Sequence, residues 1–421
     1  MKKNISIKDY PNIDFSKIPG TGKVYDELPY LTDTDAQLLA VLPIESDYYL
    51  LFDKTVFFPE EGGQSPDKGI ISISGQDIEV TDVHIQKADG IEYIFHRVNA
   101  SVGDFVCGLT SGASATMSID WSHRYSNMQN HSGEHIFSGL VHKHFGYNNV
   151  GFHLSDNSVT MDYNGPLSPE DLAKLEYEAN YVIRANFPIL CDFPSKEKLE
   201  SLEYRSKIEL EGKVRIVTIP EVDVCACCAP HVFSTCEVGQ LIIISSQNYK
   251  GGVRISILCG ERAYAYIREN KAYLDDLSHK MALPYDKISK EIDKLYTEIS
   301  GLKAEIFSYQ RELLSYKLDK LPHSYADICI TPGKTDSRVM RDTINDLKED
   351  RPGYLMILSG TDSSYNYIMG SSDKDCRKVL KELQKELDIK GGGKPEMIQG
   401  SITEPMDKIR EVLERYSFVI I

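Results

Sequence analysis

The chain has 421 residues, of which 41% are hydrophobic and 26% are charged, a composition that supports more than one folded core. Its formal net charge of -16 argues against broad nonspecific binding of nucleic acid, although a local basic groove is compatible with that sum. The sequence has no apolar run of membrane-spanning length and no signal peptide, so we expect a cytoplasmic protein with no membrane partner and with reduced cysteines.

Residues 20–105 are predicted to be mostly β. The segments DYYLLF, GIISIS, DIEVTDVHI and EYIFHRV are short and β-prone, and Gly, Asp and Asn separate them. Between two of them lies a connection rich in Gly and Pro, Asp53 to Gly69, in which Gly62 and Gly63 permit a tight turn.

The region 106–263 mixes helix and strand. Helical periodicity runs from Arg124 to Phe145, although Gly133 weakens that helix locally by about 1 kcal/mol relative to Ala. A better-marked helix follows, with Ser168 as N-cap and Pro169 at its first position. KVRIVTIP, GQLIIISS and GVRISILCG are then expected as strands.

The region 264–320 is predicted to be a long helix or helical hairpin, broken near Pro284. Apolar residues from Ile288 to Leu313 alternate four and three apart, the spacing of a coiled coil. Such pairing could form between chains or within one, and the alternative is a long amphipathic helix packed on its own domain. The last hundred residues alternate strands and helices, with Gly391 to Gly393 expected as a flexible loop close to a helix start.

Two separated stretches carry candidate metal ligands. His131 and His135 stand four apart on the predicted helix, so both imidazoles share one face. In DVCACCAPHV, Cys227 and His231 could add one thiolate and one imidazole. Three imidazoles and one thiolate suit Zn²⁺, which prefers nitrogen and sulfur ligands. The alternatives are a structural site built from the cysteines alone, or simply buried thiols.

Four stretches together resemble the AlaX-type alanyl-tRNA editing proteins, in the long form with a C-terminal DHHA1 domain. TVFFPEEGGQSPDKG is similar to the family's T-x-F-Y-P-x-G-G-G-Q-P-x-D-x-G, with Phe58 in place of Tyr and Glu61 in place of the first Gly. IDWSHRYSNMQNHSGEHIFSGL resembles D-W-x-x-R…M-x-x-H-[ST]-x-x-H-[IL]-[LF], and GGGKPEMIQGS resembles the glycine-rich segment of DHHA1. DVCACCAPHV stands where the family commonly has C-G-G-T-H-V, so the ligand spacing is kept while the loop between the ligands differs.

The resemblance implies an α+β fold in four parts. These are a β-barrel-like subdomain (1–105), a zinc-dependent editing domain of the threonyl/alanyl-tRNA synthetase second-additional-domain type (106–263), a coiled-coil linker (264–320) and an α/β DHHA1-like domain (321–421).

The resemblance also implies a function in translation fidelity. The protein would hydrolyse, without ATP, the ester that joins Ser, and also Gly, to tRNA(Ala). The chain begins directly with the editing-like region, so we expect it to act in trans on released aminoacyl-tRNA. Zn²⁺ would be held by His131, His135, Cys227 and His231.

Further roles follow from the same resemblance. Thr55 would read the serine hydroxyl, and Gln64, Gly62 and Gly63 would line the same pocket. Apart from the resemblance, the position of Glu134 next to His135 suggests that it would orient a histidine ligand, or else be a solvated helix residue. In the DHHA1-like domain, Gly391, Gly392 and Gly393 would bind the tRNA body, and this domain or the coiled coil would form a homodimer.

Two other functions compete with this interpretation. His131-Ser-Gly-Glu134-His135 is also the H-x-x-E-H pattern of zinc peptidases, in which Glu134 would be the general base and Glu209 or Glu211 a third ligand. A non-enzymatic tRNA-binding module with a structural zinc is the other alternative.

Overall fold

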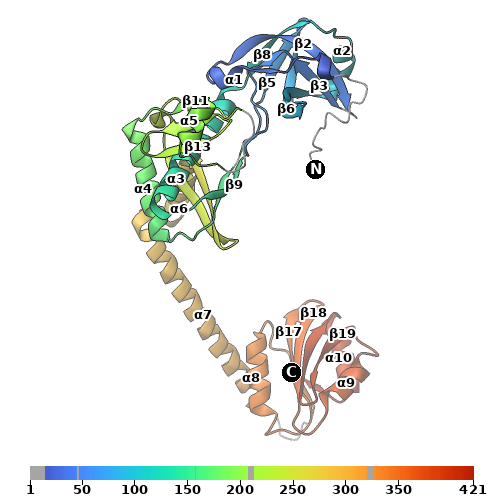
Figure 1. Cartoon of the computed structure of the whole chain (residues 1–421). Helices are drawn as coiled ribbons and strands as arrows, with labels where there is room; N and C mark the ends of the chain where they lie inside the picture. The colour runs from blue at the N-terminus through green and yellow to red at the C-terminus, as the bar shows by residue number, and fades with distance from the viewer. Residues whose placement is uncertain (1–14, 45–46, 157, 207–212, 320–326) are drawn as a thin grey trace. The chain divides into compact units, whose positions relative to one another are not determined.

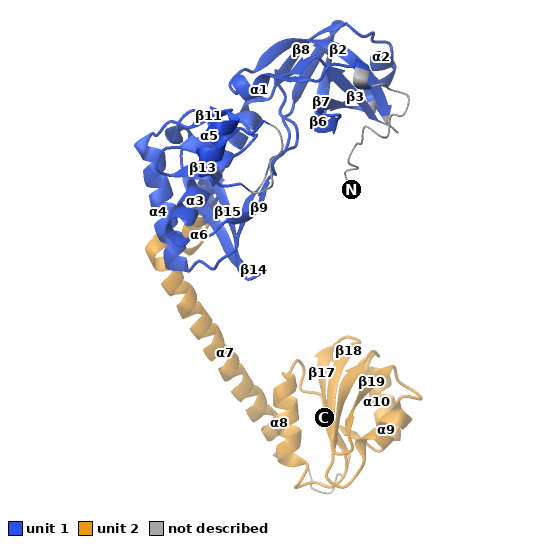
Figure 2. Ribbon diagram, viewed as in Figure 1, with its two compact units in different colours: residues 1–273 blue, residues 274–421 orange. Residues whose placement is uncertain are grey.

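The computed structural model describes residues 15–44, 47–156, 158–206, 213–319 and 327–421. It divides into two compact units, residues 1–273 and 274–421 (Figures 1 and 2). Both units mix helices with strands, which confirms the α+β expectation. No helix among the described residues is both long and apolar enough to cross a membrane.

Six strands of unit 1 close into a barrel. Side chains alternate between buried and exposed along β5 and β8, and the buried ones, such as Ile71 and Met117, fill the interior. β8 closes the ring between β5 and β2 although it lies beyond residue 105, so the boundary expected there was wrong, because the alternating SATMSI segment was overlooked. The strand order is β2 (Asp33–Ile44), β3 (Asp47–Phe52), β7 (Ile91–Val98), β6 (Gln76–Ala88), β5 (Gly69–Ile73) and β8 (Ser114–Ile119).

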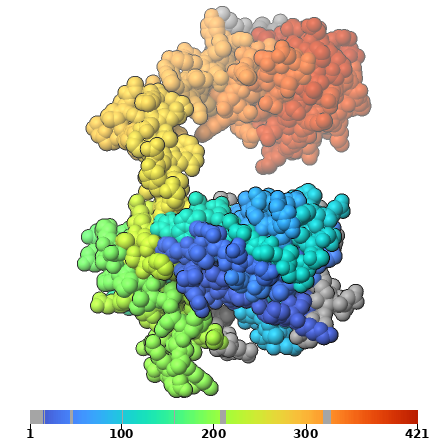
Figure 3. Space-filling view, turned by 90° about the horizontal axis from the view of Figure 1, so that it is seen from above, coloured from blue at the N-terminus to red at the C-terminus, as the bar shows by residue number. Residues whose placement is uncertain are grey.

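Short elements join the barrel to the rest of unit 1. β1 (Gly22–Lys23) pairs with β4 (Lys54–Thr55), and α1 (Val24–Glu27) follows β1. Beyond β4 the chain turns at Gly62 and Gly63 and reaches the edge of a second subdomain, where Ser65 N–H donates to the Leu154 carbonyl at 2.9 Å. In Figure 3 the blue and cyan surface of the barrel lies directly beside the green surface of that subdomain.

The second subdomain is built around α3 (Trp121–Phe145), a helix with mostly buried residues that Asp120 caps. Gly133 and Gly139 lie where a Cβ would overlap Cys259 and the Val222 carbonyl, so close packing explains glycine inside this helix despite its poor propensity. Two sheets pack with α3: β14-β15-β10-β9 and β11-β12-β13. Their strands are β9 (Asn149–Leu154), β10 (Val159–Tyr163), β11 (Leu190–Asp192), β12 (Ile216–Ile219), β13 (Asp223–Ala226), β14 (Leu241–Tyr249) and β15 (Gly252–Cys259).

The helix predicted after Ser168 is present as α4 (Pro169–Ala185). The Ser168 side chain accepts from Asp171 N–H, and the Asp171 carboxylate accepts from Ser168 N–H, which completes a capping box. The remaining helices of the region are α2 (Gly103–Cys107) and α5 (Lys196–Ser201).

Two helices carry the chain from unit 1 into unit 2. α6 (Gly260–Met281) ends before Ala282, which has a φ of 51°, and α7 (Tyr285–Asp319) begins just after Pro284, so the predicted break is present. The heptad residues in the middle of α7 remain solvent-exposed, with Leu295, Ile299, Leu302, Ile306 and Leu313 between 42% and 55% exposed.

The rest of unit 2 is a six-stranded sheet with helices. Gly391 to Gly393 lie in its edge strand β19 rather than in a loop, so that expectation was wrong: the antiparallel partner β20 orders a stretch that has little strand propensity of its own. The strand order is β19 (Ile389–Lys394), β20 (Met397–Ile402), β18 (Ser364–Gly370), β17 (Leu355–Thr361), β16 (Ile328–Ile330) and β21 (Val419–Ile420), and the helices are α8 (Ser337–Leu347), α9 (Cys376–Leu383) and α10 (Met406–Arg415).

Candidate metal centre

α3 supplies two of the four candidate ligands. His131 and His135 lie one turn apart on its buried face, with ring centroids 5.4 Å apart, and each is 1% exposed. This is the geometry that the four-residue spacing predicts.

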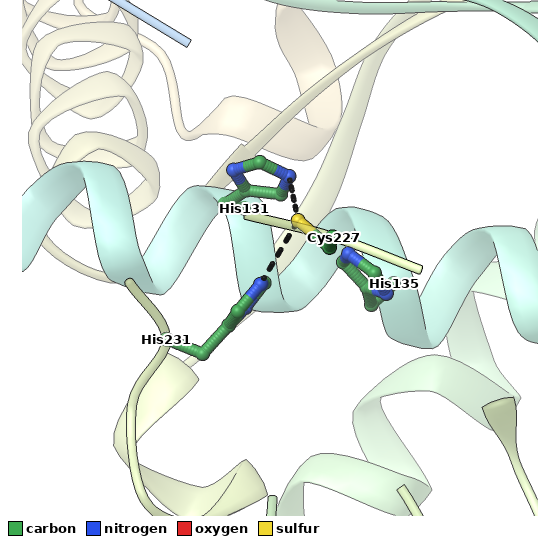
Figure 4. A group of neighbouring side chains, drawn as sticks. All are labelled: His131, His135, Cys227 and His231. Carbon is green, nitrogen blue, oxygen red and sulfur yellow. Dashed lines mark hydrogen bonds between the residues drawn. The ribbon is translucent and has the colours of Figure 1, made fainter. Parts of the chain in front are cut away.

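The loop after β13 supplies the other two ligands. Arg215 holds the backbone of this loop, since its NH1 group donates to the carbonyls of Cys227 at 3.2 Å and Ala229 at 2.7 Å. Cys227 N–H in turn donates to the Arg215 carbonyl at 3.1 Å. These bonds place the Cys227 and His231 side chains against the same face of α3 (Figure 4).

The distances within this cluster fit a tetrahedral zinc site. Cys227 Sγ lies 3.5 Å from Nε2 of His131 and 3.5 Å from Nε2 of His231. A tetrahedron with ordinary Zn–N and Zn–S bonds has an N···S edge of about 3.6 Å. Ligand atoms of all four residues, His135 included, lie within 4.8 Å of one another, so the four can hold one metal ion.

The other ring nitrogen of each histidine has a protein partner. His131 Nδ1 lies 2.7 Å from Gln64 Oε1, His135 Nδ1 lies 2.9 Å from Asp223 Oδ2, and His231 Nδ1 lies 3.0 Å from Ser132 Oγ. Such partners fix the ring orientation and leave Nε2 for the metal. Gln64 was among the predicted residues, whereas Asp223 and Ser132 were missed.

The missed partners carried weak sequence signals. Ser132 is adjacent to His131, and Asp223 precedes Cys227 by four residues, but only the fold brings Asp223 to His135. Arg205 completes that arrangement: its side chain donates to Asp223 at 2.7 and 2.8 Å.

Charge within the cluster favours a thiolate. Burial alone would raise the pKa of the Cys227 thiol, but the surrounding imidazoles lower it well below its ordinary value. For an imidazole, burial has the opposite effect from that on a thiol. It lowers the pKa of His231 to about 3, so this ring is neutral. Burial opposes protonation of His135 too, yet Asp223 and Cys227 raise its pKa to about 9, so a metal ion would displace a proton there.

A tight turn holds Gln64 against His131. Gly62 and Gly63 have φ values of 61° and 84°, which favour glycine. A Cβ on Gly63 would lie 2.6 Å from the Phe152 carbonyl oxygen, and one on Gly62 would lie 3.3 Å from Cys228 Sγ. The structure therefore brings Gly62, Gly63 and Gln64 to the metal centre together.

A buried ion pair anchors the segment that carries this turn. Arg124 on α3 donates to the Asp67 carboxylate, to the Pro29 carbonyl at 2.9 Å and to the Val56 carbonyl at 2.6 Å. Both charged side chains are 0% exposed. Sequence reasoning did not assign roles to this pair, although both residues fall inside the motifs that carry the family resemblance.

Thr55 lies outside this cluster. It is 0% exposed at the end of β4, where its Oγ1 is 2.7 Å from Nε2 of His96 on the barrel strand β7 and accepts from Phe57 N–H at 3.0 Å. His96 Nδ1 lies 3.1 Å from the Leu50 carbonyl, an acceptor, so the imidazole donates there and the Thr55 hydroxyl donates to Nε2.

Glu134 is not a solvated helix residue, because it is 0% exposed. Its Oε1 accepts from Ser138 Oγ and from Asn149 Nδ2, each at 2.6 Å. Its Oε2 lies 3.9 Å from His135 Nε2, close to the metal ligands. Asp223 is the carboxylate within hydrogen-bond distance of His135 Nδ1.

The two extra cysteines differ in position. Cys225 is 2% exposed and forms a second possible metal group with His135 and Asp223, in which Asp223 is already held by Arg205. Cys228 borders the Gly62 turn. Glu209 and Glu211, the third ligands that a peptidase would need, lie outside the described residues.

Comparison with known proteins places the chain among tRNA-related sequences. Residues 214–256 match the threonyl and alanyl tRNA synthetase second additional domain, and residues 21–123 match the class II (A) tRNA synthetases. The alanyl-tRNA editing protein AlaX-L of Pyrococcus horikoshii is 30% identical over 250 residues, 59% of this chain and 60% of that protein.

Longer alignments come from alanine–tRNA ligases. The alanine–tRNA ligase of Ignicoccus hospitalis is 27% identical over 417 residues, 96% of this chain but 44% of the ligase. The chain thus spans less than two thirds of these relatives. The C-Ala domain of Aquifex aeolicus alanyl-tRNA synthetase matches 22% of this chain and 91% of its own at 20% identity, with a TM-score of 0.19 that supports no statement about fold.

Proposed function

We propose that this chain, a homologue of the AlaX-type alanyl-tRNA editing proteins, is an aminoacyl-tRNA deacylase that removes Ser, and also Gly, from tRNA(Ala). The observation that carries the proposal is the cluster of His131, His135, Cys227 and His231, held against the glycine turn by Gln64. The name of the relative in Pyrococcus horikoshii supports the reaction, and the second additional domain supports the class of enzyme.

Such an enzyme meets a physical need. A synthetase pocket for a small apolar amino acid discriminates against a smaller or hydroxylated one by only about 1–3 kcal/mol. A separate site that hydrolyses the wrong ester restores fidelity.

Zn²⁺ fits the donor set of the cluster, and when bound it would supply a Lewis acid beside the ester. Gln64 would act on the substrate as well as on His131. Within the described part of the chain its Nε2 is buried without a hydrogen-bond partner, so it can donate to a carbonyl oxygen of the ester.

Glu134 would hold the proton of the attacking water. Its Oε2 lies 3.9 Å from His135 Nε2, the ring nitrogen left for the metal, and Ser138 and Asn149 fix its other oxygen. A water that attacks the ester carbonyl would pass one proton to Glu134, and the proton would then go to the leaving tRNA hydroxyl.

Thr55 would favour serine by accepting a hydrogen bond. Its only proton is donated to His96, so the remaining lone pair of Oγ1 can accept from a serine hydroxyl but Oγ1 cannot donate to one. Because Thr55 is 0% exposed, this role requires a rearrangement that exposes its Oγ1 to the substrate.

Unit 2 would hold the body of the tRNA and join two copies of the chain. Lys390 and Lys394 flank the glycines of β19, and Lys390 to Lys394 are all exposed, so phosphates can approach the backbone and both ammonium groups. The exposed heptad residues of α7, Leu295, Ile299, Leu302, Ile306 and Leu313, form a seam along the helix. This seam would pair with the same seam of a second chain as a coiled coil.

The two competing functions have less support. The zinc peptidase requires two histidines and a glutamate as ligands, whereas the cluster joins His131 and His135 to a thiol and a third imidazole, those of Cys227 and His231. A purely structural zinc gives no reason for Gln64 to keep a buried donor unpaired among the described residues.

Deacylation assays test the proposal directly. Ser-tRNA(Ala), Gly-tRNA(Ala) and Ser-tRNA(Thr) are incubated with the protein before and after chelation. We expect release of Ser and Gly from tRNA(Ala) that chelation abolishes and Zn²⁺ restores. Release from none of the three substrates would refute the enzyme, and faster release from tRNA(Thr) would reassign the tRNA.

A further inference from the structure

The turn beside the metal centre carries a carboxylate at Glu61, where the resembling family has glycine. Gln64 N–H donates to the Glu61 carbonyl at 3.1 Å, and the two residues form an antiparallel bridge. Directly opposed residues of such a bridge project their side chains to the same side, with Cβ atoms about 5 Å apart. Glu61 is therefore placed alongside Gln64, which contacts the ligand His131.

Several polar atoms near this turn are buried without a partner. Counting described residues only, Glu61 Oε2, Gln64 Nε2 and Tyr25 Oη have no hydrogen bond. An unsatisfied buried group costs about 1–3 kcal/mol, so an acceptor and a donor left unpaired side by side point to a ligand that satisfies both.

The cationic side chains near Glu61, those of Lys23 and Arg215, interact with other groups. Glu61, Lys23 and Arg215 all lie close enough to Cys228 to act on its thiol. Lys23 Nζ lies 2.7 Å from the Glu92 carboxylate, and Arg215 donates to the carbonyls of Cys227 and Ala229. Asp26 adds another carboxylate to this neighbourhood, so the position suits a positively charged group.

We propose that Glu61 binds the α-ammonium group of the aminoacyl ester. The inference rests on the proposed function and identifies what the site recognises besides the amino-acid side chain. In an aminoacyl ester the ammonium nitrogen and the carbonyl are bonded to the same carbon, which matches an acceptor at Glu61 and a donor at Gln64. The site would then select esters with a free amine and reject esters whose amine is acylated, such as peptidyl-tRNA.

The test compares two esters that differ only at the α position. One is Ser-tRNA(Ala), and the other is the same tRNA esterified with the α-hydroxy analogue of serine. We expect Glu61→Gln to lower kcat/KM for the seryl ester about tenfold or more, mostly through KM, and to change that for the hydroxy ester less than twofold. Glu60→Gln, one residue earlier and exposed, is the matched control and should change neither value.

Equal losses on both esters, or no loss on either, would overturn the inference. If the wild-type protein hydrolysed neither ester, the proposed function would fail, and calorimetry on the zinc-loaded protein would still decide the role of Glu61. Hydrolysis-resistant 3′-amide analogues of seryl- and hydroxyacyl-adenosine serve as ligands there. Glu61→Gln should weaken binding of the seryl analogue alone, and unchanged binding of that analogue would contradict the role.

Discussion

Two helices of this chain depart from the usual pattern, in which a helix buries apolar side chains and exposes polar ones. α3 departs from it on its buried face, and α7 on its exposed face. α3 buries polar side chains that are at most 1% exposed: Arg124, Asn127, Asn130, His131, Ser132, Glu134, His135 and Ser138. α7 leaves apolar side chains such as Ile299 and Ile306 about half exposed. Burying polar groups is costly unless they are paired, and exposing an apolar seam is costly unless something covers it. The difference is what the proposed chemical site on α3 and the proposed coiled-coil pairing of α7 would require.

Removing one ligand from α3 should have the largest effect. His135→Ala leaves three of the four candidate ligands and removes the imidazole that Asp223 contacts, so we expect loss of bound zinc and at least about a hundredfold loss of deacylation. His144→Ala is the matched control, since His144 lies on the exposed end of the same helix and pairs with Glu178. Metal analysis and deacylation rates measure both changes, and full activity in His135→Ala would refute the metal assignment.

The second-largest effect should appear when ion pairs on the two helices are broken and the losses in the free energy of unfolding are compared. Arg124→Met leaves Asp67 charged and buried and should lower the free energy of unfolding of unit 1 by about 3–5 kcal/mol. Arg311→Met on α7 breaks an exposed pair with Asp346 and should cost less than about 1 kcal/mol. Urea unfolding measures both values, and similar losses would remove the distinction drawn between the helices.

A third test extends the comparison to a buried polar residue of the barrel. Burial lowers the pKa of His96 to about 4, so the folded protein keeps this ring neutral where the unfolded chain, with a pKa near 6.5, protonates it. The contribution of His96 to the free energy of unfolding is therefore complete above pH 6.5. It is lost as the pH falls toward 4, by about 2 kcal/mol between pH 7.5 and 5. His96→Gln should remove this part of the pH dependence in urea unfolding, and parallel profiles for the two proteins would contradict it.

The smallest effect on the fold should come from the α7 seam. Ile299→Asp should change the unfolding free energy of a single chain by less than about 0.5 kcal/mol, because the residue is 48% exposed. The same change should dissociate a dimer that pairs through the seam. Ala304→Asp, which the heptad spacing places on the opposite side of the helix, is the control. Analytical ultracentrifugation measures the effect, and a monomeric wild-type chain would contradict coiled-coil pairing.

Local patterns in the sequence predicted much of this molecule. The cap at Ser168, the break at Pro284 and the shared face of His131 and His135 depend on residues close together in the chain. Asp223, Arg205 and Ser132 could not be assigned because their roles depend on how β13 and the following loop pack against α3. The glycines of β19 were predicted as a loop because pairing with β20, not their own propensity, makes them a strand.

The H-x-x-E-H pattern singles out Glu134 and the family resemblance singles out Thr55, but neither shows what surrounds these side chains. Burial of Glu134 among Ser138, Asn149 and His135 removes the solvated alternative. The hydrogen bond from Thr55 to His96 limits what Thr55 can recognise. Physical contacts therefore refine roles that motifs alone leave open.

The most direct measurement of the central claim is a zinc titration of the metal-free protein. Deacylation of Ser-tRNA(Ala) is followed as Zn²⁺ is added to chelated, dialysed chain, and bound metal is measured in the same samples. The rate should rise in proportion to bound zinc and reach its plateau at one ion per chain. Full deacylation without metal, or a plateau rate that zinc does not change, would contradict the account.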